Sequence, residues 1–490
     1  MRRRQALTLL LAALFVEALY VFIVSAGHPT HWPSYEGFLN DLADGFRAGH
    51  LHLAIEPPPA LLARANPFSP ENRGLWYWDA SLYHGHYYLY WGPVPALLLA
   101  AGKILLRIHG PVGDEVVVFA LMTVQLAAST WIVGRAARTT FADPPLALQA
   151  LAVVVLGLVN PNAYNLARGD VYEAAIVGGQ AFLLLGVACA FEAVAHPQAP
   201  RRWLVAAGCA WALAFGCRGT VAPAIAVLLL LVALFWARRS GLPRGAMLLA
   251  CAAVPVALGL GGLLLYNRLR FDAWLEFGRR FQLTWIDAPI SPRFIFANLY
   301  SFFLRAPLLS CRFPYVFAVT DMGARALPSG YVPPAGYFVY EPVAGVLSAM
   351  PWSWAIPIGW FAAIRDWRRG RPLQVAWAIA VATTAGLVGL SVTMLVASAT
   401  NRYLGDGAGG LALAGTFGVW VAYAACRRMP AARRAVMAAA VALGCLTSAA
   451  GLALGFYGQY AHFPAHNLEL SDKLIRGLSV CRGPLPSPPK

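Results

Sequence analysis

Apolar runs of about twenty residues recur along almost the whole chain, and no other feature limits its fold as strongly. A helix of that length spans the hydrocarbon core of a bilayer, where it satisfies its own backbone hydrogen bonds. Of the 490 residues, 59% are hydrophobic and only 12% are charged, whereas soluble domains carry about 25% charged residues. The sequence therefore predicts an all-α integral membrane protein that crosses the bilayer many times.

We expect about eleven transmembrane helices. Their approximate ranges are 6–27, 115–134, 145–160, 171–195, 203–216, 221–237, 246–266, 345–364, 374–398, 407–426 and 435–457. The gaps after the even-numbered segments hold clusters of arginine: Arg135 and Arg138; Arg201 and Arg202; Arg238, Arg239 and Arg244; Arg365, Arg368, Arg369 and Arg371; Arg427, Arg428, Arg433 and Arg434. Because Lys and Arg are enriched in cytoplasmic loops, this pattern places the N-terminus and these gaps in the cytoplasm. We expect a multi-pass protein of a bacterial inner membrane.

One further apolar stretch, YLYWGPVPALLLAAGKILLR (88–107), is expected not to cross the bilayer. Its apolar part is short and contains Gly92, Pro93 and Pro95, and short apolar runs are more often interfacial. Counting it would move every later arginine cluster to the outside, and a genuine span there is the alternative. The expected membrane domain covers 1–457 and includes two long outer loops: 28–114, with amphipathic juxtamembrane helices, and 267–344. An outer-face tail, 458–490, follows.

The chain has 38 Lys and Arg residues against 22 acidic ones. Since the basic residues lie in short clusters between apolar runs, they indicate membrane topology and not a nucleic-acid partner. The eight cysteines show no metal-ligand spacing. Cys311 and Cys481 are the two that this topology places most clearly outside, where an oxidising compartment favours a disulfide between them. Two unpaired thiols are the alternative.

The stretch YEGFLNDLADGFRAGHLHL (35–53) predicts an amphipathic helix beside the membrane. At about 100° per residue, its two sides differ: Phe38, Leu39, Leu42, Ala43 and Phe46 form the apolar side, and Glu36, Asn40, Asp41, Asp44 and Arg47 form the polar side. Such a helix lies flat on the bilayer with its polar side toward water or a cleft. A solvated helix with ordinary surface acids is the alternative.

The order of features after the first apolar run resembles the first outer loop of the GT-C glycosyltransferases. These multi-spanning enzymes use polyprenyl-phosphate-linked sugars and include protein O-mannosyltransferases, aminoarabinose transferases and oligosaccharyltransferases. AGHLHL and GHYYLYWGPVPALLL are similar to a family helix ending in GGLYL and to the YY..PP..PLLL stretch that follows it. This similarity places Glu36 at the family's catalytic acid, where the usual Asp-Glu pair reads Tyr35-Glu36. Asp41 and Asp44 lie close enough to substitute for it.

A second stretch, NPNAYNLARGDVYEAA (160–175), resembles the family's second outer loop, in which an Arg precedes a Gly and an acid. Arg168, Asp170 and Glu173 match that order. A helix start whose acids are favoured by the helix dipole is the alternative. YNRLRFDAWLEFGRRFQLT (266–284) and NRYLGDGAGGLALAG (401–415) also resemble bacterial membrane proteins of this type.

The resemblance implies a membrane glycosyltransferase that moves a sugar from a polyprenyl-phosphate donor to a lipid, glycan or protein acceptor on the periplasmic face, among membrane lipids. The expected roles are as follows: Glu36 and Asp170 catalytic; Asp41, Asp44 and Glu173 supporting acids; Arg168 and Arg402 phosphate-binding; Tyr87, Tyr88, Tyr90 and Trp91 lining the substrate groove. Guanidinium groups suit phosphate because they grip it bidentately. The aromatic residues have an alternative place in the interfacial belt of a membrane protein.

No metal-ligand motif stands out, since His84 and His86 are two positions apart and not at a helical ligand spacing. We expect no resident metal; Mg²⁺ or Mn²⁺ held by Glu36 and Asp170 is the alternative. A second class of function is a transporter or flippase for lipid-linked sugars. Transporters place charges inside their spans, and here the expected spans hold few, among them Glu17 and Glu192. A non-catalytic membrane protein that retains the fold is a third reading.

Overall fold

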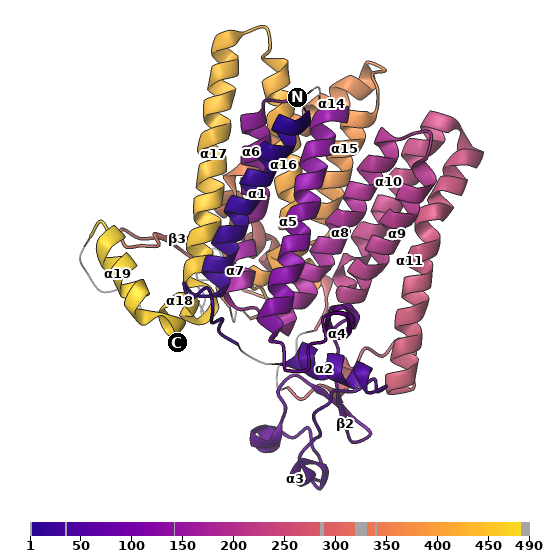
Figure 1. The fold of residues 1–490 in the computed structure, drawn as a ribbon, viewed down its shortest axis with the longest axis vertical. Coiled ribbons are helices and arrows are strands. Elements are labelled where there is room, and N and C mark those ends of the chain that lie inside the picture. The colour runs from indigo at the N-terminus through magenta and orange to yellow at the C-terminus, as the bar shows by residue number, and fades with distance from the viewer. Residues whose placement is uncertain are drawn as a thin grey trace.

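The computed structural model describes residues 2–34, 37–141, 143–284, 289–318, 331–338 and 341–481. Its main body is a bundle of roughly parallel and antiparallel helices (Figure 1). These are α1 (Arg2–Val24), α5 (Asp114–Thr139), α6 (Leu146–Leu158), α8 (Val171–Ala195), α9 (Pro200–Cys217), α10 (Ala222–Ser240), α11 (Leu242–Phe271), α14 (Ile356–Arg368), α15 (Gln374–Thr383), α16 (Ala408–Ala425) and α17 (Pro430–Tyr457).

Eight helices in the described residues are long and apolar enough to cross a membrane. They are α1, α5, α8, α10 with the preceding 3-10 turn η2 (Gly219–Val221), α11, α15 with its continuation through η8 (Thr384–Val388) and η9 (Thr393–Leu395), α16 and α17. The chain is thus a helical, multi-pass membrane protein. The expected count of about eleven exceeds these eight by α6, α9 and α14, which lie in the bundle but are shorter or less apolar.

The segment expected as one helix over 345–364 is divided in the structure. It forms α13 (Val346–Ala349), the 3-10 helix η7 (Pro351–Ala355) and α14. Pro351 and Pro357 each lack a backbone N–H donor, so each is favoured at the start of a helix and not in its interior. The proline positions therefore explain why this segment consists of three short pieces.

The bundle helices alternate in direction, and their arginine-rich connections gather at the end that holds the N-terminus (Figure 1). Contacts between helix ends agree with this arrangement. Gln5 at the start of α1 donates to Gln149 at the start of α6 over 2.6 Å, and Arg201 of α9 donates to the sulfur of Met247 of α11 over 3.1 Å. All the arginine clusters used to predict the topology therefore lie at one end of the molecule.

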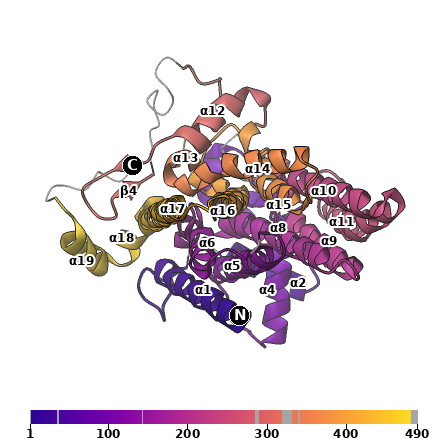
Figure 2. The same ribbon diagram turned by 90° about the horizontal axis from the view of Figure 1, so that it is seen from above.

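The sides of the bundle expose large apolar side chains, while its interior is filled by buried ones. Leu10 on α1, Leu258 on α11, Phe361 on α14 and Leu446 on α17 are all exposed. A water-soluble protein rarely exposes so much contiguous apolar surface, but acyl chains cover it without cost. Figure 2, which looks down the bundle, shows these helices around its outer edge, with α8 and α16 enclosed between them.

The first outer region caps the end of the bundle opposite the N-terminus (Figure 1). It contains α2 (Phe38–Arg47), α3 (Pro59–Leu62), η1 (Pro70–Leu75), the antiparallel hairpin of β1 (Ser81–Tyr83) and β2 (His86–Tyr88), and α4 (Val94–Leu105). The amphipathic α2 is as expected, with Phe38, Leu39 and Leu42 buried. The segment 88–107 contributes only the twelve-residue α4, which packs beside α2 and is not among the eight candidate spans.

The second outer region and the tail lie at the same end. The former contains η3 (Arg279–Phe281), η4 (Pro292–Phe294), α12 (Ile295–Leu299), the π-helix η5 (Tyr300–Leu304) and the two-residue strands β3 (Leu308–Leu309) and β4 (Val316–Phe317). The tail contains η11 (Gln459–Ala461), α18 (His462–His466) and α19 (Leu468–Leu478). A disulfide joins Cys311 to Cys481, with 5.6 Å between their Cα atoms, so the pairing expected from the sequence is present.

Candidate functional site

A cavity of about 450 Å³ lies at the capped end of the bundle. Its walls come from the residues before β1, the residues after β2, the start of α8, the turn at η2, the second outer region, and the turn η10 (Asn401–Asp406) that precedes α16. Four arginines line it: Arg168, Arg218, Arg279 and Arg402. The two acidic residues in its lining are Asp79 and Glu341. The lining itself therefore presents more guanidinium groups than carboxylates to a ligand.

Three of the four arginines are held by carboxylates, of which Glu341 lines the cavity while Glu173, Asp406 and Asp170 are buried and do not line it. Arg402 contacts Glu341 over 2.8 Å and Glu173 over 3.5 Å, Arg218 contacts Asp406 over 2.5 Å, and Arg168 contacts Asp170 over 3.1 Å. Although burial alone would lower it, the charges of Glu341 and Glu173 raise the pKa of Arg402. These ion pairs fix the guanidinium groups in position, so a ligand does not have to order them.

Asp79 is the more buried of the two carboxylates that line the cavity. It is only 8% exposed, and its backbone has a φ of 64°, in the left-handed region that Asp tolerates better than most residues. Gln282 donates to one of its oxygens over 2.9 Å, and the hydroxyl of Tyr172 donates to the other. Burial raises the pKa of Asp79 to about 6, even though the Gln282 hydrogen bond and the Arg402 charge lower it.

Aromatic side chains form much of the remaining wall. Tyr90 and Trp91 line the cavity, as the sequence predicted for a substrate groove. Tyr172 lies between two charged groups, because its hydroxyl reaches Asp79 and its ring packs 4.4 Å from the Arg402 guanidinium. Flat aromatic faces beside charged donors and acceptors suit a polar ring such as a sugar, whose C–H face packs on the aromatic surface.

Two of the expected groove residues lie elsewhere. Tyr87 and Tyr88 are on β2 and do not line the cavity. Tyr87 is buried against Tyr77, with ring centroids 5.7 Å apart, and Tyr88 packs edge-on against Phe271 over 5.3 Å. Successive side chains of a strand point to opposite faces, so the neighbouring Tyr87 and Tyr88 pack against different partners.

Asp170 is the N-terminal cap of α8, where its side chain accepts from the backbone N–H of Val171 over 2.7 Å. Its other oxygen accepts from Arg168. Gly169 packs so closely on α5 that a Cβ there would lie 2.6 Å from the Cα of Glu115. Asp170 thus has the capping role that the sequence left open as an alternative, and it also anchors an arginine of the cavity.

Glu36 lies outside the described residues, so its catalytic role stays a prediction. The described residues near it on either side attach to the start of α5. The hydroxyl of Ser34 donates to Glu115 over 3.3 Å, and the backbone N–H of Leu39 donates to Asp114 over 3.1 Å. This is also the helix end on which Gly169 packs.

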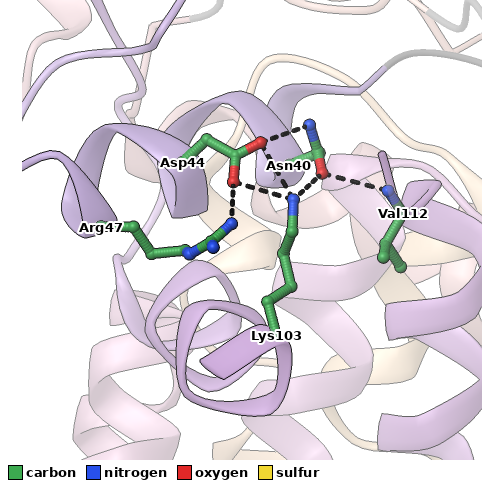
Figure 3. A network of polar contacts seen from close by, with 5 residues as sticks. All are labelled: Asn40, Asp44, Arg47, Lys103 and Val112. Atoms are coloured by element: carbon green, nitrogen blue, oxygen red, sulfur yellow. Dashed lines mark hydrogen bonds and ion pairs between the residues drawn. The ribbon is translucent and has the colours of Figure 1, made fainter. Parts of the chain in front are cut away.

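Asp41 and Asp44 are on α2 and do not line the cavity. Asp41 accepts from the hydroxyl of Tyr77 over 3.1 Å, and burial raises its pKa. Asp44 forms a network with Lys103, Arg47 and Asn40 (Figure 3). Two of the three supporting acids inferred from the sequence therefore stabilise the cap over the bundle, whereas the third, Glu173, contacts Arg402 of the cavity.

The sequence analysis missed four charged residues of the cavity: Asp79, Arg218, Arg279 and Glu341. Arg218 and Glu341 come from segments with no distinctive spacing, whereas Arg279 lies in the stretch 266–284 that the sequence analysis had quoted. Asp79 lies in WDASLYHGHYY, beside the aromatic stretch that the sequence had indicated. Only the fold brings these residues together with Arg168 and Arg402.

A divalent cation held by Glu36 and Asp170 finds little support in the geometry. Both oxygens of Asp170 already accept hydrogen bonds, one from a guanidinium, and a cation there would compete with that positive charge. We therefore derive no chemical step through a metal at this position.

No protein-family model matches the chain, and no curated protein matches it. Among solved structures, it is similar to the oligosaccharyltransferase of Archaeoglobus fulgidus. The apo form gives a TM-score of 0.46 at 12% identity, covering 91% of this chain and 56% of that one. The complex of that enzyme, AglB, with an inhibitory peptide and a dolichol-phosphate gives 0.48 at 11% identity, covering 91% and 55%. The chain thus spans about half the length of these structures.

Proposed function

We propose that this protein is a membrane glycosyltransferase that moves a sugar from a polyprenyl-phosphate donor to an acceptor outside the cytoplasm. The observation that carries the proposal is the cavity, in which four arginines, two carboxylates and several aromatic rings meet at one end of a membrane bundle. Arginines suit the phosphate of the donor, aromatic rings suit its sugar, and a carboxylate can take the proton of the acceptor. The resemblance of the first two outer loops to GT-C enzymes supports the same chemistry.

The reaction needs a carboxylate to accept the proton of the acceptor. As the acceptor oxygen bonds to the anomeric carbon, the bond from that carbon to the phosphate oxygen breaks, and polyprenyl phosphate leaves. Among the described residues, Asp79 is suited to take the proton, since a base works best when its pKa lies near the working pH and burial raises the pKa of Asp79 to about 6. Glu36 is the candidate from the family resemblance, and its substitution is the parallel test.

The arginines would stabilise the negative charge that grows on the departing phosphate. Their carboxylate partners keep them oriented before the substrate arrives, and preorganised charge is the largest contribution in many enzymes. Arg402 and Arg168 are the phosphate-binding residues expected from the sequence, and both line the cavity. Arg218 and Arg279 line the same cavity and add further positive charge near the phosphate.

The positions of the arginine clusters support a cavity on the periplasmic side of the membrane. These clusters lie at the N-terminal end of the bundle, and the cavity lies at the other end. If basic loops remain in the cytoplasm, the cavity opens on the periplasmic face of a bacterial inner membrane. A disulfide between the second outer region and the tail agrees with an oxidising compartment.

A transporter of lipid-linked sugars is the competing function. Most charged groups of the described spans lie near helix ends, as do Glu192 and Arg135, which contact each other over 2.6 Å, whereas transport sites lie near the bilayer midplane. Glu17 lies farther inside α1, where it accepts a hydrogen bond from the hydroxyl of Thr123 over 3.2 Å. The test is to incubate purified protein with radiolabelled polyprenyl-phosphate sugars and a mixture of lipid, glycan and peptide acceptors. Radiolabel that moves to a new product supports a transferase. Radiolabel that only crosses the bilayer of reconstituted vesicles, on the intact donor, supports the transporter instead.

A further inference from the structure

Three side chains of the first outer region converge away from the cavity. His52 and Glu56 lie in the segment that follows α2, and His86 lies on β2. One ligand atom from each lies within 4.8 Å of the others, and none of the three lines the cavity. We propose that His52, Glu56 and His86 bind a divalent transition-metal ion, with Zn²⁺ as the ion whose ligand preferences they match.

Two imidazoles and one carboxylate are a common ligand set for zinc, with a fourth position left for water. His52 is oriented for this role. Its Nδ1 lies 2.8 Å from the carbonyl oxygen of Leu53, which can only accept, so Nδ1 carries the hydrogen. In the neutral ring Nε2 then presents its lone pair. Metal-binding histidines typically have this kind of support on their other nitrogen.

His86 contributes an unsatisfied nitrogen. Its Nδ1 is buried and has no hydrogen-bond partner among the described residues, although it lies 3.5 Å from an oxygen of Glu56. A buried polar atom without a partner is costly. A cation between this nitrogen and the Glu56 carboxylate would satisfy both.

The backbone beneath the three ligands is already fixed. Leu53 donates its N–H to the carbonyl of Tyr87 over 2.8 Å, which joins the segment of His52 to the strand of His86. Ala54 donates to the carbonyl of Asp41 over 3.0 Å. Three prolines follow Glu56 directly and restrict the backbone there. Binding the ion would therefore require little ordering of the main chain.

The side chains retain the freedom to close the site. A tetrahedral zinc shell places its ligand atoms about 3.3 Å apart, given Zn–N distances near 2.0–2.1 Å, so the group must contract. The side chains of His86 and Glu56 are 41% and 64% exposed. The rings of His52 and His86 stack with centroids 4.2 Å apart, and rotation about their side-chain torsions would turn both rings toward one ion.

The sequence carries a signal that agrees with this site. His50 and His52 form one His-x-His pair, and His84 and His86 form another. The Leu53–Tyr87 hydrogen bond joins the segments of His52 and His86, while His84 lies in the hairpin turn with a φ of 47°. A bound ion would join the segment 50–56 to the hairpin whose first strand begins two residues after Asp79. The ion would thus stabilise one wall of the cavity without contacting a substrate bound there.

The test uses the full chain purified without a polyhistidine tag, stripped with chelator and titrated with Zn²⁺, with Co²⁺ as a spectroscopic probe. We expect one ion per chain and a rise in the unfolding temperature on adding Zn²⁺. His86→Asn and His52→Asn should each weaken binding at least about tenfold. His84→Asn is the matched control, because it changes the same residue type two positions away, outside the ligand group, and it should bind as the wild type does.

Glu56→Gln tests metal binding in a variant that is expected to fold, because that exposed side chain can be changed with little effect on stability. It should lower Zn²⁺ affinity while leaving the unfolding temperature in chelator unchanged. Wild-type protein that binds no Zn²⁺ would overturn the proposal. Equal binding by wild type, His86→Asn and His84→Asn would also overturn it, since that result indicates an adventitious ion only.

Discussion

The ammonium group of Lys103 on α4 lies 2.8 and 2.9 Å from the two carboxylate oxygens of Asp44 on α2 (Figure 3). Lys103 is 1% exposed although it lies in a stretch that is otherwise apolar. It also donates to the amide oxygen of Asn40 over 2.8 Å, and that oxygen accepts from the backbone of Val112 over 3.0 Å. One buried lysine therefore holds together α2, α4 and the chain entering α5.

Lys103→Met should destabilise the cap more than Arg47→Met does. Burial acts to raise the pKa of Asp44, but hydrogen bonds from Lys103 and Arg47 outweigh it and lower that pKa. Because Asp44 is about a third exposed, we expect a loss of about 2 kcal/mol for Lys103→Met, below the range for a fully buried pair. Arg47→Met should cost less than about 1 kcal/mol. Thermal unfolding of both variants in the same detergent provides the comparison, and equal losses would contradict it.

The same pair predicts a pH dependence of stability. A carboxylate whose pKa is lower in the folded state contributes stability above its unfolded pKa, near 3.9, and loses it as the pH falls through the folded value. Wild-type protein should therefore lose the contribution of Asp44 only at acidic pH. Asp44→Asn should unfold at a lower temperature than wild type at pH 7, and the gap should narrow below pH 4. A gap that does not depend on pH would show that the carboxylate charge contributes nothing.

Transfer activity should fall as the pH drops through about 6. Burial raises the pKa of Asp79 to about 6, and only its ionised form can accept a proton, so activity is retained above that value and lost below it. The acidic limb of the kcat/KM profile should show this pKa. Gln282→Glu places a second carboxyl beside Asp79 and should shift the limb to higher pH. A profile that stays flat from pH 5 to 8 would argue against Asp79 as the base.

Arg279 offers the clearest test of phosphate binding, because it lines the cavity but is exposed. Arg279→Gln should raise KM for the polyprenyl-phosphate sugar by about tenfold, with little change in unfolding temperature, since a charge-assisted hydrogen bond is worth about 1.5–3 kcal/mol. Arg280→Gln is the matched control at the next position, outside the cavity lining. If both variants show the same kinetics, Arg279 does not contact the donor.

The disulfide should stabilise the chain against heat. It closes a loop of 170 residues, for which the chain-entropy model gives up to about 5 kcal/mol. The tail is also held by hydrogen bonds, since Val480 donates to the carbonyl of Cys311 over 2.9 Å. Cys311→Ser/Cys481→Ser should therefore unfold at a lower temperature than the wild type and become insensitive to reductant. Alkylation of both thiols without prior reduction, in protein from an oxidising compartment, would show that the bond does not form.

Much of the architecture could be predicted because the bilayer imposes a simple rule on sequence. Long apolar runs and the alternation of arginine clusters located most bundle helices to within a few residues, and Gly92 with two prolines marked 88–107 as different. The division of 345–364 followed from Pro351 and Pro357, which a hydropathy pattern averages away. Among the described residues, length and composition alone support eight transmembrane helices.

The site was less accessible to sequence reasoning. Arg168, Arg402, Tyr90 and Trp91 were expected from motifs and do line the cavity. Asp79 and Glu341 were missed because their importance arises from burial and from partners far along the chain, such as Gln282 and Arg402. Asp44 was given a supporting role because it lies on the polar face of a predicted helix. The sequence does not show that the buried Lys103 pairs with it.

The most direct test of the central claim is release of polyprenyl phosphate by purified protein from a defined polyprenyl-phosphate sugar, followed by mass spectrometry of the lipid products in the presence of acceptor. We predict turnover by the wild type and a loss of at least about 100-fold in kcat for Asp79→Asn, with the unfolding temperature retained. Glu36→Gln, measured in parallel, tests whether the family's acid shares that role. Release of no lipid phosphate by folded wild-type protein, with any donor and acceptor supplied, or full turnover by both Asp79→Asn and Glu36→Gln, would contradict the account.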